Sequence, residues 1–306
     1  MMCSHNKGCI IVEKGQVINE APFTSGVGNL KAMAYANHVD AYFLVINHKV
    51  YKKTISGLHQ DLWIGGFTFG YNHHTPFEYS VKNRRIFTMI GTKTIAVINP
   101  EKKEVEFQLP LSFADYIMDY KFFGENHEFI AFVTWNRYIA VFKYDAEKKE
   151  GSIITHLHYP AYPGKPGDHG MHLSVDPKRH VFMVTNTYTS NHHGLHSRVT
   201  TFELWNNRFT LKHSLNEFGL PRIEALNFVK YYKNHVIFIG VDQAKGGNTH
   251  LFRYNLHTGV AIEDTAKRVS HLEDYTHYLD RYGDWFYYTG RHGGLNRVQV
   301  YESEGL

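Results

Sequence analysis

Residues 167–199 read GDHGMHLSVDPKRHVFMVTNTYTSNHHGLHSRV. Apolar and polar residues alternate over Met171–Val175, which is typical of a strand with one buried side, and Asp176–Arg179 has the composition of a tight turn. A second apolar run covers Val181–Thr187, and a third strand pattern begins at Arg198. The stretch therefore predicts strands that run up and down in one antiparallel sheet.

Similar units occur along the whole chain. Strand-like runs come in groups, at 30–37, 41–47, 49–56 and 62–69, then 77–82, 85–90, 94–98 and 105–109, then 116–122, 129–134, 138–144 and 152–158, then 171–175, 181–187, 198–204 and 209–213, then 223–231, 236–241, 250–255 and 260–267, and finally 276–281, 285–289 and 297–301. The groups recur at roughly 40–55 residues, the period expected for the four-stranded blades of a β-propeller.

This repeat predicts an all-β fold, a six-bladed β-propeller of four-stranded blades, with residues 1–306 as a single domain. The last group lacks a fourth strand, and the N-terminal run Cys9–Val12 is predicted to supply it. Such closure would remove two open sheet edges. The chain resembles the six-bladed propeller architecture but carries neither the Gly-His and Trp-Asp signature of WD40 repeats nor the double glycine of kelch repeats.

Composition narrows the classes of function. Charged residues make up 20% of the 306 residues, the formal net charge is +4, and no run of Lys and Arg indicates a nucleic-acid partner. No uninterrupted apolar stretch reaches about 18 residues, so no membrane span is expected, and the absence of a signal-like start predicts a cytoplasmic protein. Two cysteines, Cys3 and Cys9, indicate neither a disulfide framework nor a zinc site built on thiolates.

Polar residues fall unevenly on the two faces that a propeller would have. One face receives the loops that enter each first strand and those that join second to third strands. Histidine and arginine collect there, at His48, His73, His74, His169, His172, His192, His193, His196, His277, Arg291 and His292. The connections between second and third strands also lengthen in the later groups, at 190–197, 243–249 and 290–296. Long loops on a rigid scaffold often hold binding residues, so this face is the predicted functional face.

Histidine suggests two kinds of chemistry. Imidazole is the commonest metal ligand, and His169, His172 and His277 are predicted to converge on the axis and hold a divalent transition metal. Alternatively, a histidine with tyrosine and arginine could move a proton and stabilise an anion. The predicted catalytic residues are His172, His277, Tyr188 and Arg291, and the predicted substrate-binding residues are Arg222, His192, His193, His292 and Tyr275.

Asp168, His172 and the run Asn191-His192-His193 are similar to the His/Tyr/Arg sets of polysaccharide lyases built on propellers, over about one blade. This resemblance implies an enzyme of lyase or hydrolase type acting on a saccharide or another polar, anionic small molecule. The alternative is a non-catalytic propeller that binds a protein or a glycan through the histidine-rich loops. A stoichiometric transition metal in the purified protein would favour the enzyme.

Overall fold

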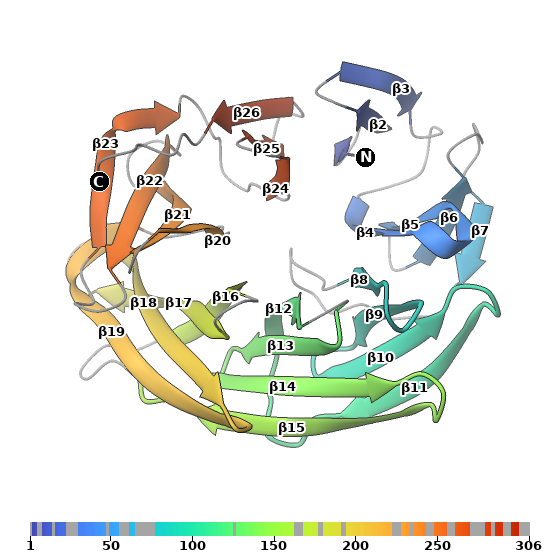
Figure 1. Ribbon diagram of the computed structural model, residues 1–306, viewed down its shortest axis with the longest axis horizontal. Coiled ribbons are helices and arrows are strands. Elements are labelled where there is room, and N and C mark those ends of the chain that lie inside the picture. Colours follow the sequence, from blue (N-terminus) through green and yellow to red (C-terminus); the bar gives the residue numbers. More distant parts are fainter. Residues whose placement is uncertain are drawn as a thin grey trace. The chain divides into compact units, whose positions relative to one another are not determined.

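A computed structural model gives the fold of the chain (Figure 1). It describes residues 2–4, 8–13, 16–22, 30–46, 49–54, 61–64, 77–124, 127–161, 168–176, 180–190, 194–221, 228–232, 235–242, 248–255, 261–269, 279–282, 285–289 and 295–299. The chain forms two compact units, one of residues 24–217 and one of residues 1–23 with 218–306. Each unit is built from antiparallel sheets.

The unit of residues 24–217 holds four sheets in chain order, each with four strands. The strands are β4 (Leu30–Ala36), β5 (Ala41–Ile46), β6 (Lys49–Thr54) and β7 (Asp61–Ile64); β8 (Phe77–Ser80), β9 (Arg85–Ile90), β10 (Thr94–Asn99) and β11 (Glu104–Pro110); β12 (Ile117–Phe123), β13 (Phe129–Thr134), β14 (Tyr138–Asp145) and β15 (Glu150–His158); and β16 (His169–Asp176), β17 (Val181–Ser190), β18 (Gly194–Trp205) and β19 (Arg208–Pro221). A short 3-10 helix, η1 (Asn37–Val39), joins β4 to β5. Each strand pairs with its neighbour in sequence, as the alternation predicts.

Both faces of these sheets are buried, because neighbouring sheets stack on one another. Ile86 and Ile98 point into a core shared with β4–β6, whereas Phe87 and Val97 belong to the next core, shared with β12–β14. Side chains on a strand alternate between the two sheet faces, so a strand buried on both sides reads as a continuous apolar run. A third core around Phe182 joins β12–β15 to β16–β19. This stacking of four-stranded sheets in sequence is the packing of propeller blades.

The second unit holds three sheets. Its strands are β1 (Met2–Ser4), β2 (Gly8–Glu13) and β3 (Gln16–Pro22); β20 (Phe228–Tyr232), β21 (His235–Asp242), β22 (Asn248–Asn255) and β23 (Ala261–Val269); and β24 (Leu279–Tyr282), β25 (Trp285–Thr289) and β26 (Leu295–Gln299). Cys3 and Cys9 are register partners in the hairpin of β1 and β2.

The N-terminal segment differs from the expected closing strand. Cys9–Val12 lies in β2, which pairs with β1 along one edge and with β3 along the other. A strand has only two hydrogen-bonding edges, so β2 has none left for β24–β26. Residues 16–22, which were not predicted to form a strand, form β3. The described strands thus pair into seven sheets, five of four strands and two of three, in place of six.

Turn chemistry follows the local sequence. Asn206 and Asn207 form the two-residue connection of β18 and β19, and both have positive φ, 47° and 57°. Asparagine tolerates this region better than most residues, and such turns match the twist of a hairpin.

No helix in the described ranges has the length and the apolar character needed to cross a bilayer.

Candidate functional site

Loops from three consecutive sheets meet on one face of the unit of residues 24–217. Backbone hydrogen bonds connect them: Leu111 N donates to Lys93 O at 3.0 Å, Ile117 N to Thr92 O at 2.9 Å, Trp135 N to Tyr116 O at 2.9 Å, Tyr159 N to Arg137 O at 3.0 Å, and Gly170 N to Trp135 O at 3.3 Å. We call the surface of Lys93, Phe113, Tyr116, Trp135, Arg137, Tyr138, His156, His158 and His169 the loop face. It lies on the second to fourth sheets, at the strand ends where the sequence places the histidine-rich loops. The long loops at 190–197, 243–249 and 290–296 lie partly outside the described residues, so their place in a functional face stays a prediction.

Aromatic rings form a row on this face. The Phe113 ring stacks on His156, with centroids 4.6 Å apart and planes 6° apart. Tyr138 lies 4.7 Å from His158, its register partner across β14 and β15. Both histidines are exposed, and Phe113 and Tyr138 are half-buried. The rings therefore hold one another in place while they remain open to solvent.

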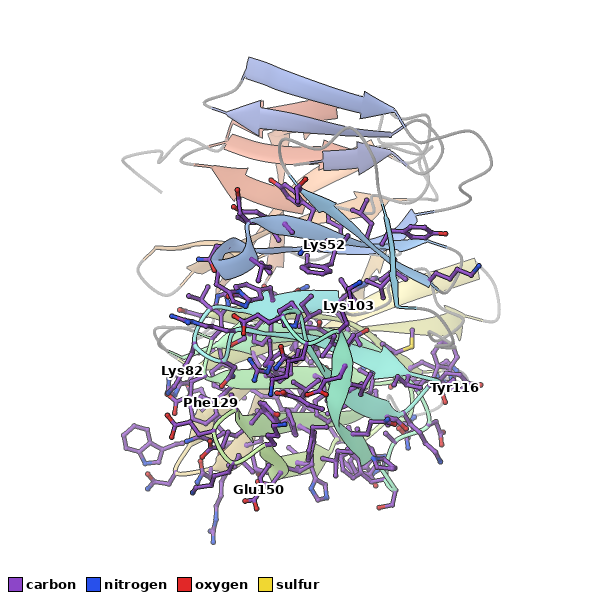
Figure 2. The ribbon with its side chains drawn as sticks, turned by 90° about the vertical axis from the view of Figure 1, so that its right-hand side faces the viewer. Lys52, Lys82, Lys103, Tyr116, Phe129 and Glu150 are labelled. Atoms are coloured by element: carbon purple, nitrogen blue, oxygen red, sulfur yellow. The ribbon has the colours of Figure 1, made fainter. Side chains whose placement is uncertain are left out.

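Two further aromatic side chains belong to the loop face. Tyr116 is 42% exposed and Trp135 is 36% exposed, although both are large side chains. Figure 2 shows Tyr116 on one side of the unit, with Lys82 and Phe129 on the opposite side. The indole of Trp135 stacks on the His169 ring at 3.8 Å between centroids, which gives it a fixed base on β16. Large apolar groups held rigid at a surface are suited to bind a partner.

Gly170 makes this stacking arrangement possible. A Cβ atom at this position would lie 2.5 Å from the backbone oxygen of Thr134 and 2.9 Å from the Tyr159 hydroxyl. Only glycine permits that approach of β16 to β13. His169 was predicted to converge on the axis with His172 and His277, and the described contact of its ring is the stack on Trp135. Burial lowers the pKa of His169 and outweighs the opposite effect of the Asp168 carboxylate.

A buried ion pair lies beneath the loop face. Arg198 Nη2 is 2.6 Å from Asp168 Oδ2, and their side chains are 4% and 0% exposed. The same guanidinium donates to Pro160 O at 2.9 Å, and Arg137 Nη1 donates to Asp168 O at 2.9 Å. The network ties β14, the segment after β15, the entry to β16, and β18 together. Asp168 and Arg198 therefore have a structural role, since they hold the loops that carry Trp135 and His169.

His172 is a buried residue at an irregular position. The pairing of β16 with β17 shifts register between Gly170 and His172, and the His172 side chain is buried. Tyr188 lies in β17 opposite His196 of β18. Among the described residues, no group of three or more His, Cys, Asp or Glu side chains is arranged to hold a metal ion. The convergence of His169, His172 and His277 stays a prediction, because His277 lies outside the described residues.

Most other predicted site residues also lie outside the described residues: His192, His193, Arg222, Tyr275, Arg291 and His292. The structure adds residues that sequence reasoning missed, namely Phe113, Tyr116, Tyr138, His156 and His158. Phe113 and Tyr116 lie on the short connection of β11 and β12, and the other three lie within β14 and β15, so loop length gave no signal for them. The alternation of His156 and His158 toward the end of a strand was the signal that could have identified them.

The innermost strands carry a charged cluster. Lys121 Nζ lies 3.2 Å from Asp119 Oδ1 on β12, and Asp119 Oδ2 accepts a hydrogen bond from Leu173 N of β16 at 2.9 Å. Burial raises the pKa of Glu78 on β8 to about 7, although Lys121 acts in the opposite direction. Asp119 thus bridges two innermost strands, and Glu78 is a carboxyl group that titrates near neutrality.

The opposite face, which we call the turn face, is formed by Lys82, Glu104, Glu128, Lys143, Asp145, Lys148 and Lys149. Its ions are paired: Glu128 with Lys143 at 3.1 Å and Lys82 at 3.5 Å, Lys148 with Asp145 at 3.7 Å, and Lys149 with Glu104 at 3.8 Å. It too has a buried anchor, the pair of Glu106 and Arg85. Burial alone would raise the pKa of Glu106, but hydrogen bonds from Arg85 and Tyr144 hold it below its usual value.

Comparison with known proteins identifies the fold but no family. No family model matches the chain, and no curated protein matches it. Among solved structures, the chain is similar to the β-propeller domain of Cps50 (Swd1) from Myceliophteria thermophila, with a TM-score of 0.57, 10% identity, and coverage of 94% of this chain and 88% of that one.

A protein from Lactobacillus plantarum gives a TM-score of 0.50 at 10% identity, covering 83% of this chain and 88% of that one. A chain of the mitotic checkpoint complex gives 0.52 at 8% identity, covering 78% and 66%. At such identities the likeness concerns the fold alone. Together with the stacked sheets, it shows that the chain is a β-propeller.

Proposed function

We propose that the chain is a non-catalytic β-propeller that binds a partner protein through the loop face. The observation that carries this proposal is the set of exposed rings on rigid supports, above all Trp135 on His169 and Tyr116 beside it. Tryptophan, tyrosine and arginine are the residues most enriched at the energetic centres of protein interfaces. One similar structure, the chain of the mitotic checkpoint complex, is itself part of a protein assembly.

The catalytic hypothesis has less support in the described residues. His169, which was expected to serve as a ligand or an acid–base group, packs against Trp135. Asp168, which is part of the resemblance to propeller lyases, is buried against Arg198. Both side chains thus have a structural explanation. The metal, the saccharide ligand, and the roles of His277 and Arg291 stay predictions that no described contact supports.

Site-specific photocrosslinking tests the proposed function. A benzophenone amino acid would replace Tyr116 in one variant of the full chain and Lys102, on the opposite face, in another. We expect discrete protein adducts in cells from the Tyr116 position, and loss of these adducts when Trp135 is also changed to Ala. Equal adducts from both positions, or adducts indifferent to Trp135→Ala, would contradict a docking role for the loop face.

We also propose that the N-terminal sheet completes the propeller as a sheet of its own. Residues 1–23 belong to the same compact unit as residues 218–306, which supports a place for β1–β3 beside the C-terminal sheets. Deletion of residues 1–22 should then expose sheet edges and apolar surface and give aggregated protein. A truncated chain that stays monomeric and melts cooperatively would contradict this proposal.

A further inference from the structure

The loop face carries an excess of positive charge. Lys93 is exposed in the connection of β9 and β10, and Arg137 is half-buried in the connection of β13 and β14. Beyond the loop face, Lys49 is exposed at the corresponding end of β6 in the first sheet. The exposed acidic group among them is Asp115, because the carboxylate of Asp168 is buried against Arg198. In contrast, four lysines of the turn face, Lys82, Lys143, Lys148 and Lys149, each lie within 4 Å of a carboxylate oxygen.

Arg137 is held ready for a carboxylate. Its Nη1 donates to the backbone oxygen of Asp168 at 2.9 Å, which restricts a side chain that would otherwise have many rotamers. A guanidinium fixed in this way loses less entropy when a carboxylate binds, and its planar fork suits that ligand. Trp135 lies on the same loop as Arg137. Tyr116 lies on the neighbouring loop, and Trp135 N donates a backbone hydrogen bond to Tyr116 O. Charge and aromatic surface are therefore combined in one place.

We propose that the loop face takes an extended acidic segment of a partner protein. Aspartate or glutamate side chains of that segment meet Lys93 and Arg137, and its apolar side chains cover Trp135 and Tyr116. This inference rests on the proposed function and specifies the partner. The loops from Lys93 to His169 are linked one after another, so a single segment of a partner can contact cations and rings that come from consecutive sheets.

Single-stranded RNA is also acidic and also stacks on aromatic rings, but the charges fit it less well. Proteins that bind single strands track the phosphates with a continuous positive groove. Here the cations are few, and the carboxylate of Asp115 is exposed among them. A peptide can have acidic side chains opposite the cations and neutral side chains opposite Asp115, whereas RNA carries a phosphate at every nucleotide.

Selection of peptides on the full chain tests the inference. A phage library of random peptides of about 12 residues, a length that spans roughly 40 Å when extended, would be selected on the immobilised protein. A synthetic form of the best peptide would then be titrated by fluorescence anisotropy. We expect Asp and Glu to be enriched, and Lys93→Glu, Arg137→Gln and Trp135→Ala each to weaken binding by about tenfold. Lys102→Glu, on the opposite face, should leave the affinity unchanged.

The outcomes separate the two proposals. Peptides that depend on Trp135 and Tyr116 but show no acidic enrichment and no response to Lys93→Glu would overturn the acidic partner and leave the docking face intact. Peptides indifferent to Trp135→Ala and Tyr116→Ala would overturn the docking face itself. Tighter binding of a 12-nucleotide oligouridylate that the same variants weaken would overturn a protein partner. Lys93 is exposed, so its variant tests the charge even where Arg137→Gln loosens the fold.

Discussion

The loop face and the turn face of the same four sheets handle charge and aromatic surface in opposite ways. On the turn face, exposed lysines lie beside exposed or half-exposed carboxylates, as in Lys149 with Glu104 at 3.8 Å. On the loop face, the ion pair of Asp168 and Arg198 is buried, and rings such as Trp135 are left at the surface. A lysine and a carboxylate that pair at the surface neutralise each other's charge. An exposed ring, or a cation with no carboxylate beside it, is available to bind a partner. Both faces have a buried pair, since Glu106 pairs with Arg85 beneath the turn face, so the faces differ in what lies at the surface: paired ions on one, and on the other rings on loops that the pair of Asp168 and Arg198 holds.

The largest effect should come from the buried pair. Asp168→Ala leaves the Arg198 guanidinium buried without its carboxylate, and removal of one partner of a buried pair costs about 3–5 kcal/mol. The matched control is Glu203→Ala, which removes the carboxylate of an exposed pair with Lys212 and should cost less than about 1 kcal/mol. Urea unfolding of both variants measures the difference. Equal losses of unfolding free energy in the two variants would show that the buried pair stabilises the fold no more than an exposed pair does.

The next effect concerns the close approach beneath Trp135. In Gly170→Ala, the added methyl group meets the Thr134 backbone oxygen at 2.5 Å, and backbone cannot move aside as a side-chain tip can. Overpacking of this kind costs about 1–3 kcal/mol. The Trp135 fluorescence spectrum should also shift, because β16 carries the His169 ring on which the indole stacks. Ser112→Ala, exposed on the same face, should change neither quantity.

Sequence patterns predicted the strands well where both sheet faces are buried. The apolar runs at 85–90 and 129–134 coincide with β9 and β13, because neighbouring residues such as Ile86 and Phe87, or Phe132 and Val133, point into different cores. The N-terminal strands were predicted poorly, since Gln16–Pro22 has little alternation and ends in proline. Which strand pairs with which does not appear as a local pattern in the sequence.

The same distinction holds for the candidate site. Strand order alone gives which end of a strand a loop occupies, so the sequence assigned the loops to two faces, and that one of them is the functional face stays a prediction. The sequence did not reveal the structural roles of His169 and Asp168, because their partners are distant in the chain. Trp135 lies 34 residues before His169, and Arg198 lies 30 residues after Asp168. Loop length favoured the later sheets, whereas the exposed rings lie on short connections. Their exposure depends on packing that the pattern of residues does not reveal.

A third test concerns the innermost strands between the two faces. The pKa of Glu78 is raised by burial from 4.5 to about 7, so between these values the folded chain keeps a proton that the unfolded chain has lost. The free energy of unfolding should therefore fall as pH rises through this window, by on the order of 2 kcal/mol, and then level off. Glu78→Gln should remove this decline, as urea unfolding at several pH values would show. A decline that persists in the variant would assign it to other groups.

The smallest effect should come from the turn face, and a double-mutant cycle on Glu128 and Lys143 measures it. The two side chains are 25% and 45% exposed with their ions 3.1 Å apart, so their coupling should be about 0.2–1 kcal/mol. The loss of stability in Lys143→Ala alone would overstate this coupling, because Lys143 Nζ also lies 5.2 Å from the centre of the Phe129 ring. The cycle subtracts the contribution of that second contact.

The coupling should shrink toward zero near 1 M salt, where the screening length falls to about 3 Å. The buried pair of Asp168 and Arg198 should keep its coupling under the same salt, since little ionic solution reaches it. If salt weakened both pairs alike, Asp168 would be as solvated as Glu128, and the loop face would lose the anchor that holds Trp135 and His169 in place.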